Sequence, residues 1–213
     1  PIGGNDYEIR TYILNQQTGA FDLEGPLTWT ARERNQVDVV GRDEASGHYY
    51  VITDKFSDKA VVYMYDPVAD KFSDAPVFAH PDFSASDVIL GRHPDNFNMP
   101  LGFTYDGLVT ETYWIDPEVK SIQDGLEAIF PNLLVDIMDW NMDRSRILFS
   151  TSESDSPATY YLLLDKSRLA VIGSSRPWFN EYKMSRSELV YYPARDGLQI
   201  PAIFTPAVGW KEG

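Results

Sequence analysis

Cysteine is absent from the 213 residues of this chain. Disulfide bridges, thiolate nucleophiles and cysteine-ligated metals are therefore excluded from these residues, and the redox compartment is left open. The apolar runs are all far shorter than the roughly 20 residues of a membrane-spanning helix, so we expect no membrane partner. The opening residues, PIGG, show neither an initiator methionine nor the regions of a secretory signal peptide. They leave both cytoplasm and periplasm open.

Positive charge is also scarce, with 18 Lys and Arg against 32 Asp and Glu, for a formal net charge of −14. We expect no nucleic-acid partner, because binding to the phosphate backbone requires a basic surface. The favoured interpretation is an acidic surface that aids solubility, rather than a preference for basic substrates. The aromatic content of 14%, which includes 13 Tyr, favours β structure.

Short apolar runs separated by polar turns occupy most of the chain, and one layout recurs in residues 47–72 and 145–170. Runs of this length, rich in aromatic and branched residues and bounded by Ser, Asp and Pro, are typical of strands. The shared marks are a Ser-Asp pair in the middle turn and an aspartate after the middle strand: Ser57-Asp58 with Asp66, and Ser154-Asp155 with Asp165.

An Asp or Asn that follows a strand gives this layout a period. Asn15, Asp66, Asp116 and Asp165 are separated by 51, 50 and 49 residues. Such side chains accept hydrogen bonds from backbone amides two residues on, and so set a turn. A period near 50 residues with about four strands predicts β-propeller blades of four-stranded antiparallel sheets. Because propellers have about four to eight blades, the four copies predict a partial ring.

The expected strands cover most of each copy. They are residues 7–14, 20–23, 37–40, 77–79, 87–90, 101–105, 108–115, 133–140, 146–151, 160–164 and 169–173. Gly25-Pro26 predicts a loop in a polar segment that continues to Arg34, and the SESDSP run at 152–157 is expected to interrupt a strand. Asp106-Gly107 predicts a tight hairpin with positive φ at its centre.

One helix is predicted near 117–130, in place of an outer strand. Asp116 is a suitable N-cap and Pro117 a suitable first-turn residue. The apolar residues that follow have helical spacing over about three turns; they are Val119, Ile122, Leu126 and Ile129. Further along, residues 177–187 do not resemble a blade, and 189–205 predict two strands joined at Asp196-Gly197. The expected division is a propeller over 1–180, a linker over 181–187 and a hairpin over 188–213.

The segment ARDGLQIPAIFTPA at 194–207 resembles a hairpin of the prolyl oligopeptidase-type serine peptidases. There the hairpin leads from the propeller into the α/β-hydrolase domain. The dipeptidyl aminopeptidase and acylaminoacyl peptidase branch is the most similar. Three further segments resemble that family: Asp116 to Pro131, Asp139-Trp140 with SESDSPATYYLLLD, and Ser175 to Trp178. Residues before Asp116 resemble only generic blades.

The resemblance implies an all-β partial propeller followed by the first strands of an α/β-hydrolase domain. The whole enzyme would hydrolyse peptides by acyl transfer, with the propeller admitting short or unfolded peptides to the hydrolase domain. Its nucleophile lies in a Gly-x-Ser-x-Gly motif, which this chain lacks, since Gly173-Ser174-Ser175 is followed by Arg176. No catalytic, cofactor or metal residue is therefore expected here. Nor do adjacent glutamates occur, which the dipeptidyl-peptidase branch uses to hold a substrate amine.

The three histidines are the obvious ligand candidates. His80-Pro81-Asp82 and His93-Pro94-Asp95 repeat one tripeptide, and His48 is the third. Two His and two Asp suit a metal site, but X-Pro followed by Asp is more typical of a turn. We favour turns, and no pattern supports a Ser-His-Asp triad.

Two other groups of residues have a structural and a functional interpretation. Asp136, Asp139 and Asp143 lack the spacing and central glycine of a calcium loop, and we expect turn and strand-end roles. Trp114, Trp140 and Trp178 are suited to line a peptide channel, although packing between blades is the more common role of such residues.

A stand-alone propeller that binds proteins is the alternative function, because a 50-residue period alone allows it. The DGLQIP segment distinguishes the two, since an independent propeller has no reason to carry it. In either case an incomplete ring exposes strand edges and apolar faces, so we expect self-association.

Overall fold

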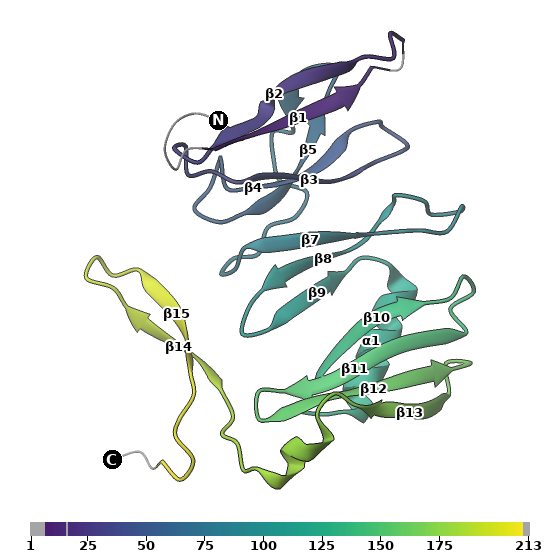
Figure 1. Ribbon diagram of the computed structural model, residues 1–213, viewed down its shortest axis with the longest axis vertical. Coiled ribbons are helices and arrows are strands. Elements are labelled where there is room, and N and C mark those ends of the chain that lie inside the picture. Colours follow the sequence, from purple (N-terminus) through teal and green to yellow (C-terminus); the bar gives the residue numbers. More distant parts are fainter. Residues whose placement is uncertain (1–6, 16, 211–213) are drawn as a thin grey trace. The chain divides into compact units, whose positions relative to one another are not determined.

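The computed structural model describes residues 7–15 and 17–210, and the chain divides into two compact units, 1–116 and 117–213. Each unit is mostly antiparallel β structure (Figure 1). This confirms the β character of the predicted all-β class, but the sheets have two to four strands, where four strands in each blade were predicted. Within the described residues no helix has the length and apolar character to cross a membrane. The predicted division into 1–180, 181–187 and 188–213 stays a prediction.

The first unit contains three antiparallel sheets that follow one another along the chain. Their strands are β1 (Glu8–Leu14), β2 (Phe21–Thr30), β3 (Val37–Arg42), β4 (Tyr49–Thr53), β5 (Val61–Asp66), β6 (Lys71–Phe72), β7 (Ala85–Leu90), β8 (Pro100–Asp106) and β9 (Thr110–Trp114). The sheet orders are β1-β2, β3-β4-β5-β6 and β7-β8-β9. Each strand pairs with its neighbour in sequence, as a meander does.

The middle sheet of this unit buries side chains on both of its faces, because successive residues of a strand point to opposite sides. Tyr50, Ile52 and Val62 pack with Ala85, Val88 and Phe103 of the third sheet. On the opposite face Val51 and Tyr65 pack with Leu27 of β2. The three sheets are therefore stacked face to face.

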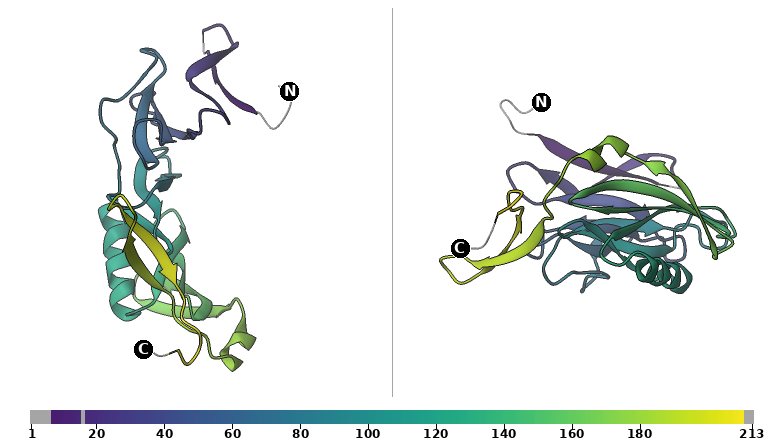
Figure 2. Two further views of the ribbon diagram at one scale, coloured as in Figure 1. Left: turned by 90° about the vertical axis from the view of Figure 1, so that its left-hand side faces the viewer. Right: turned by 90° about the horizontal axis from the view of Figure 1, so that it is seen from below.

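The second unit contains one four-stranded sheet, two helices and a final hairpin. Its elements are α1 (Pro117–Ile129), β10 (Leu134–Trp140), β11 (Arg146–Glu153), β12 (Ser156–Leu164), β13 (Arg168–Ser174), the 3₁₀ helix η1 (Pro177–Glu181), β14 (Glu188–Pro193) and β15 (Gln199–Phe204). The sheet order is β10-β11-β12-β13, and β14 pairs with β15 alone. Helix α1 lies along this sheet (Figure 2), and the Phe130 ring after it contacts Phe149 and Tyr161.

The predicted helix is confirmed, and its bounds differ by one residue from those expected. Val119 and Leu126 are buried, as their spacing predicts. Ile129 was expected on the same face, but it is 58% exposed because it lies in the last turn, at the edge of the contact with the sheet. The third sheet has only three strands among the described residues. After its last strand, β9, the chain forms α1, at the point where the other copies would continue into an outer strand.

The loop predicted at Gly25-Pro26 is wrong, because β2 continues through it. Ile9 pairs with Trp29 and Thr11 with Glu24, so Arg10 alone lies opposite residues 25–28. This large bulge accommodates a proline without a ladder N–H. The Thr11 hydroxyl donates to the Leu27 carbonyl at 3.0 Å, and Leu27 is fully buried.

The interruption predicted over 152–157 is also too long. Glu153 pairs with Ser156, so β11 and β12 extend to a turn at Ser154-Asp155. The register shifts between Thr151 and Glu153, and Pro157 lies on the opposite strand at this bulge. A proline is tolerated there because the regular hydrogen-bond ladder is already broken.

Two predicted details of the first unit are corrected as well. The hairpin at Asp106 pairs that residue with Thr110, which leaves a three-residue loop, and Gly107 is not among the residues with positive φ. The strand predicted at 77–79 is reduced to one bridge, from Phe78 to Val62. This bridge comes after β6 in the chain. The loop between β6 and Phe78 therefore divides the outer strand of the sheet into two short parts.

The 50-residue period corresponds to one repeated position in the sheets. Asn15 and Asp165 directly follow β1 and β12, Asp66 is the last residue of β5, and Asp116 comes two residues after the end of β9. Asn15 Oδ1 accepts from the amides of Gln17 and Thr18, and Asp66 Oδ1 from those of Val68 and Ala69.

At Asp165 the turn is formed differently. Asp165 and Lys166 both have positive φ, and the Asp165 carboxylate accepts from the Arg168 guanidinium at 2.8 Å. The position in the repeat is retained, while the hydrogen bonds that form the turn vary.

Candidate functional site

The two His-Pro-Asp tripeptides form turns, in agreement with the favoured interpretation. His80 Nδ1 accepts from the amides of Asp82 and Phe83, both at 3.1 Å. His93 Nδ1 accepts from the amide of Asp95 at 3.2 Å. The capping group in each turn is therefore the His imidazole and not the Asp carboxylate. The His80 ring also stacks on Tyr105, with ring centroids 4.3 Å apart.

His48 lies at another place in the first unit. Its Nε2 is 3.5 Å from a carboxylate oxygen of Asp66, the last residue of β5. In the part of the chain that the structure describes, no three His, Asp or Glu side chains form a group that suits a metal ion. The three histidines thus contact three separate turns.

The three candidate aspartates have local roles. Asp139 Oδ1 accepts from the Trp140 amide at 2.9 Å. Asp143 Oδ1 accepts from the Ser145 amide at 3.0 Å. The pKa of Asp143 is lowered, mainly by the Ser145 hydroxyl and next by this amide. Desolvation raises the pKa of Asp136. None of these contacts forms a calcium loop.

The three tryptophans have different environments. Trp114 is buried against Gly102, where an added Cβ would lie 2.9 Å from Trp114 Cε3. This is a packing role, since only glycine leaves room for the indole. The Arg144 guanidinium lies 5.7 Å from the centre of the Trp140 ring, as in a cation–π contact. Trp178 is exposed on η1. Packing is thus established for Trp114, and a channel-lining role stays a prediction.

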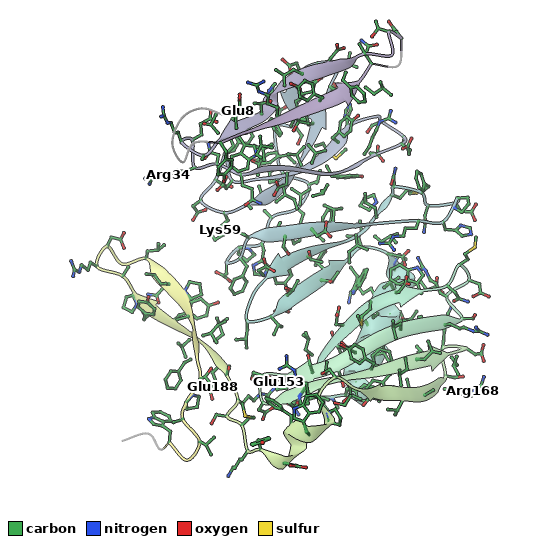
Figure 3. The ribbon with its side chains drawn as sticks, viewed as in Figure 1. Glu8, Arg34, Lys59, Glu153, Arg168 and Glu188 are labelled. Atoms are coloured by element: carbon green, nitrogen blue, oxygen red, sulfur yellow. The ribbon has the colours of Figure 1, made fainter. Side chains whose placement is uncertain are left out.

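A set of long-range contacts joins the β11–β12 turn to the chain that enters β14. We call it the exit joint and define it as Asn132, Glu153, Ser154, Arg186 and Ser187. Arg186 donates to the Glu153 carboxylate and, at 2.9 Å, to the Asn132 carbonyl. Ser187 donates its amide to the Ser154 hydroxyl at 2.8 Å. Figure 3 labels Glu153, at the end of β11, and Glu188, at the start of β14, the two strand ends that the joint connects.

The exit joint is polar and partly shielded from solvent. The Glu153 side chain is 14% exposed. Burial alone would raise the pKa of Glu153, but the Ser154 amide and hydroxyl and the Arg186 guanidinium together hold that pKa below its usual value. The Ser187 hydroxyl also lies 2.7 Å from the hydroxyl of Thr205, the residue directly after β15. The contacts thus fix both ends of the last hairpin to the β11–β12 turn.

The sequence did not predict the exit joint. It identified the Ser154-Asp155 turn, but also Ser57-Asp58, where the Ser57 hydroxyl donates only locally, to the Lys59 carbonyl at 2.6 Å. Ser154 and Ser187 are 33 positions apart. No local pattern distinguishes a serine that holds a distant segment from one that closes its own turn.

A second polar cluster was also missed. The buried Tyr65 hydroxyl lies 2.6 Å from an oxygen of Asp70 and 2.8 Å from one of Glu24. Burial and these two side chains raise the pKa of Tyr65 far above its ordinary value. The cluster ties β2 to β5, and Asp70 has positive φ in the turn after β5.

Comparison of the chain with profiles of protein families and with curated proteins finds no match. The resemblance of residues 194–207 to a peptidase hairpin therefore has only the residues themselves as its basis. What the geometry adds is a position: that segment begins in the β14–β15 turn and ends beyond β15.

Proposed function

We propose that the sheets of this chain are about four blades of a partial β-propeller, the C-terminal part of the propeller of a prolyl oligopeptidase-type serine peptidase. Residues 188–213 would open its α/β-hydrolase domain. The 50-residue period, the meander order and the face-to-face packing in the first unit support the propeller. The role of this chain is then to control access of short peptides and to dock the catalytic domain.

The β14–β15 hairpin is the observation that carries the peptidase proposal. Tyr191 and Tyr192 are adjacent, so they lie on opposite faces of β14, and both are exposed. Ile203 and Phe204 of β15 are exposed as well. A two-stranded hairpin is at best marginally stable in water. Apolar side chains on both faces are typical of strands in a sheet covered on both sides, as in the sheet of a hydrolase.

The exit joint supports this role by its position. It holds the chain where the four-stranded sheet ends and the hairpin begins, through one partly shielded ion pair and hydrogen bonds at both ends of the hairpin. A fixed exit direction is what a propeller needs if it is to cover a catalytic domain that follows it in the chain. A binding propeller has no such requirement.

The chemistry belongs to the domain that follows. A serine in a Gly-x-Ser-x-Gly motif would attack the peptide carbonyl, with a histidine as base and an aspartate orienting it. The residues of this chain would select substrates by size, since only short or unfolded peptides pass a propeller. No step of the reaction requires a side chain from residues 1–213.

An activity assay tests this division of roles. We expect the purified 213-residue chain to hydrolyse neither peptide nor ester substrates, and a longer product of the same reading frame to hydrolyse short peptides. Hydrolysis by the 213-residue chain itself would contradict the proposal. A longer product that has no hydrolase motif but captures a folded protein would favour the alternative, a binding propeller.

A further inference from the structure

The hydroxyl group of Tyr65 lies between two carboxyl groups in the interior of the first unit. Tyr65 is fully buried. Its hydroxyl oxygen is 2.6 Å from an oxygen of Asp70 and 2.8 Å from an oxygen of Glu24. Both distances are typical of O–H···O hydrogen bonds. One phenol oxygen therefore joins a carboxyl group of β2 to a carboxyl group of the turn after β5.

The cluster of Glu24, Tyr65 and Asp70 has too few hydrogens for both contacts if the two carboxyl groups are ionised. A phenol has one O–H, and an ionised carboxylate can only accept. One of the contacts would then join two oxygens with no hydrogen between them. Such a contact is repulsive, and it is costly next to a fully buried side chain. One further proton removes the repulsion, because a protonated carboxyl group can donate to the phenol oxygen.

In the described part of the chain, no cation takes the place of that proton. Neither Glu24 nor Asp70 forms an ion pair there, and Arg10, opposite the bulge of β2, pairs with Glu8. The two carboxyl groups therefore have no positive side chain to compensate their charges.

The core around Tyr65 is otherwise apolar. It consists of Leu27, Val37 and Val51, with aliphatic and aromatic side chains packed against it. The remaining titratable group in this core is the phenol of Tyr49, which lies opposite Tyr65 on β4. Only the cluster itself can thus supply or accept the additional proton near neutral pH.

The distances and the exposure of the side chains assign the proton to Glu24. An O–H···O bond to an ionised carboxylate is roughly 2.5–2.7 Å long, and one between neutral groups roughly 2.7–2.8 Å. The contact of Asp70 matches the first class and the contact of Glu24 the second. Asp70 is exposed in its turn, whereas Glu24 is half-buried. Burial disfavours the charged form of a carboxyl group.

We propose that this cluster is a proton-dependent latch, in which Glu24 keeps its proton and donates it to the Tyr65 oxygen while Tyr65 donates to the ionised Asp70. Loss of the proton would place the Glu24 carboxylate against the phenol oxygen and weaken the contact between β2 and the turn after β5. The latch would thereby control how firmly the first sheet is attached to the second. This inference depends on neither the propeller nor the peptidase proposal, so each can fail alone.

The direction of the pH effect follows from this assignment. A glutamic acid in an unfolded chain is ionised above about pH 4.3, so folding would take up a proton at neutral pH. Stability rises as the pH falls wherever the folded state binds more protons than the unfolded state. The contribution of the latch is therefore fully present below the range in which free carboxyl groups titrate. It is lost as the pH rises and Glu24 ionises in the folded chain.

The number of protons taken up on folding tests the latch. It is obtained from the slope of the unfolding free energy of the 213-residue chain against pH, between about pH 5 and 8. We expect the parent to take up as much as one proton more than Glu24→Gln, whose side-chain amide can always donate to Tyr65. Asp70→Asn should lower the uptake in the same way, since only one carboxyl group then remains. Asparagine also tolerates the positive φ of position 70.

Asp58→Asn is the matched control. It removes a carboxylate whose side chain is 78% exposed, and it should leave the proton uptake unchanged. The three histidines titrate in the same pH range, but all four proteins contain them, so their contribution cancels in the comparison. Circular dichroism of each variant shows whether it retains the fold.

Infrared spectroscopy at neutral pH gives a second measurement that the parent chain alone can fail. The C=O stretching band of a protonated carboxyl group should be present in the parent and absent from Glu24→Gln. Absence of this band from the parent, or equal proton uptake by the parent and Glu24→Gln, would overturn the inference. Stabilisation of the parent but not of Glu24→Gln by calcium at constant pH would also overturn it, because a cation would then hold the two carboxylates.

Discussion

Ser187 donates its backbone N–H to the hydroxyl of Ser154, 33 positions earlier in the chain, over 2.8 Å. Ser154 in turn donates to Glu153 Oε1 at 2.9 Å. The turn between β11 and β12 is therefore more than a connection between strands, because it holds the segment from which the last hairpin starts.

Replacement of Arg186 should loosen this joint. In Arg186→Ala the Glu153 carboxylate loses its ion pair and the Asn132 carbonyl loses a donor. We expect faster proteolysis at residues 182–187 and a fall of about 1 kcal/mol in the free energy of unfolding, because the guanidinium is half exposed. Arg195→Ala, in the β14–β15 turn, is the control. Equal cleavage rates in both variants would show that the joint does not hold the hairpin.

Two residues near the C-terminal end of α1 provide a matched pair for the core. Leu126 is 2% exposed, so Leu126→Ala should cost about 2–5 kcal/mol of unfolding free energy through lost burial and a cavity. Ile129→Ala, on the same helix but largely exposed, should change it by about 0.5 kcal/mol or less. Urea denaturation measures both. Similar losses would mean that α1 does not pack through Leu126.

Two glycines should respond to alanine with opposite signs. Gly125 lies within α1 with nothing near its missing Cβ, and Gly125→Ala should stabilise by about 0.5–1 kcal/mol through helix propensity. At Gly91 a Cβ would lie 2.1 Å from the Asn96 carbonyl oxygen. Gly91→Ala should therefore destabilise by about 1–3 kcal/mol. Thermal unfolding distinguishes them, and a stabilised Gly91→Ala would contradict the packing described there.

Acid should weaken the attachment of α1. The Lys166 ammonium lowers the pKa of Glu118 below its ordinary value of 4.5. Partial desolvation of the Glu118 carboxylate opposes this effect, and the Arg144 guanidinium adds to it. A carboxylate with a lowered pKa stabilises the fold at pH above the unfolded value, and that contribution is lost as pH falls through the folded value. The melting temperature of Glu118→Gln should consequently fall less than that of the parent below pH 4.5. Parallel curves of melting temperature against pH would contradict this role.

The last hairpin should make the chain self-associate. Ile203 is 58% exposed on β15, and the hairpin has apolar side chains on both faces. We expect the mass measured by light scattering to rise with concentration, and Ile203→Lys to reduce that rise. Val68→Lys, which adds the same charge in a turn, should not. A parent chain that stays monomeric at high concentration would show that this surface does not self-associate.

The sequence predicted the elements well where the apolar period and the turn or cap residues agree, as in β1 and α1. It failed where a strand tolerates a local irregularity. Gly25-Pro26 indicates a loop by composition, yet Arg10 on the opposite strand accommodates four residues as a bulge. The cost of that bulge is offset by burial of Leu27, which depends on residues of the second sheet. A local pattern contains no information about that burial.

The candidate site was less predictable than the fold. The turn roles of His80 and His93 follow from X-Pro chemistry, although the capping atom is an imidazole nitrogen. The contacts of Arg186 and Tyr65 join residues that are distant in sequence. Such pairs are set by the packing of whole sheets, and the residue types alone do not indicate them.

The reading frame beyond Gly213 tests the proposed function most directly. If this chain is the end of a peptidase propeller, the longer product contains a Gly-x-Ser-x-Gly serine with an aspartate and a histidine after it. Peptide hydrolysis by that product should be lost when the serine is changed to alanine. A stop codon directly after Gly213, or a longer product with no such motif and no hydrolysis, would contradict the proposal.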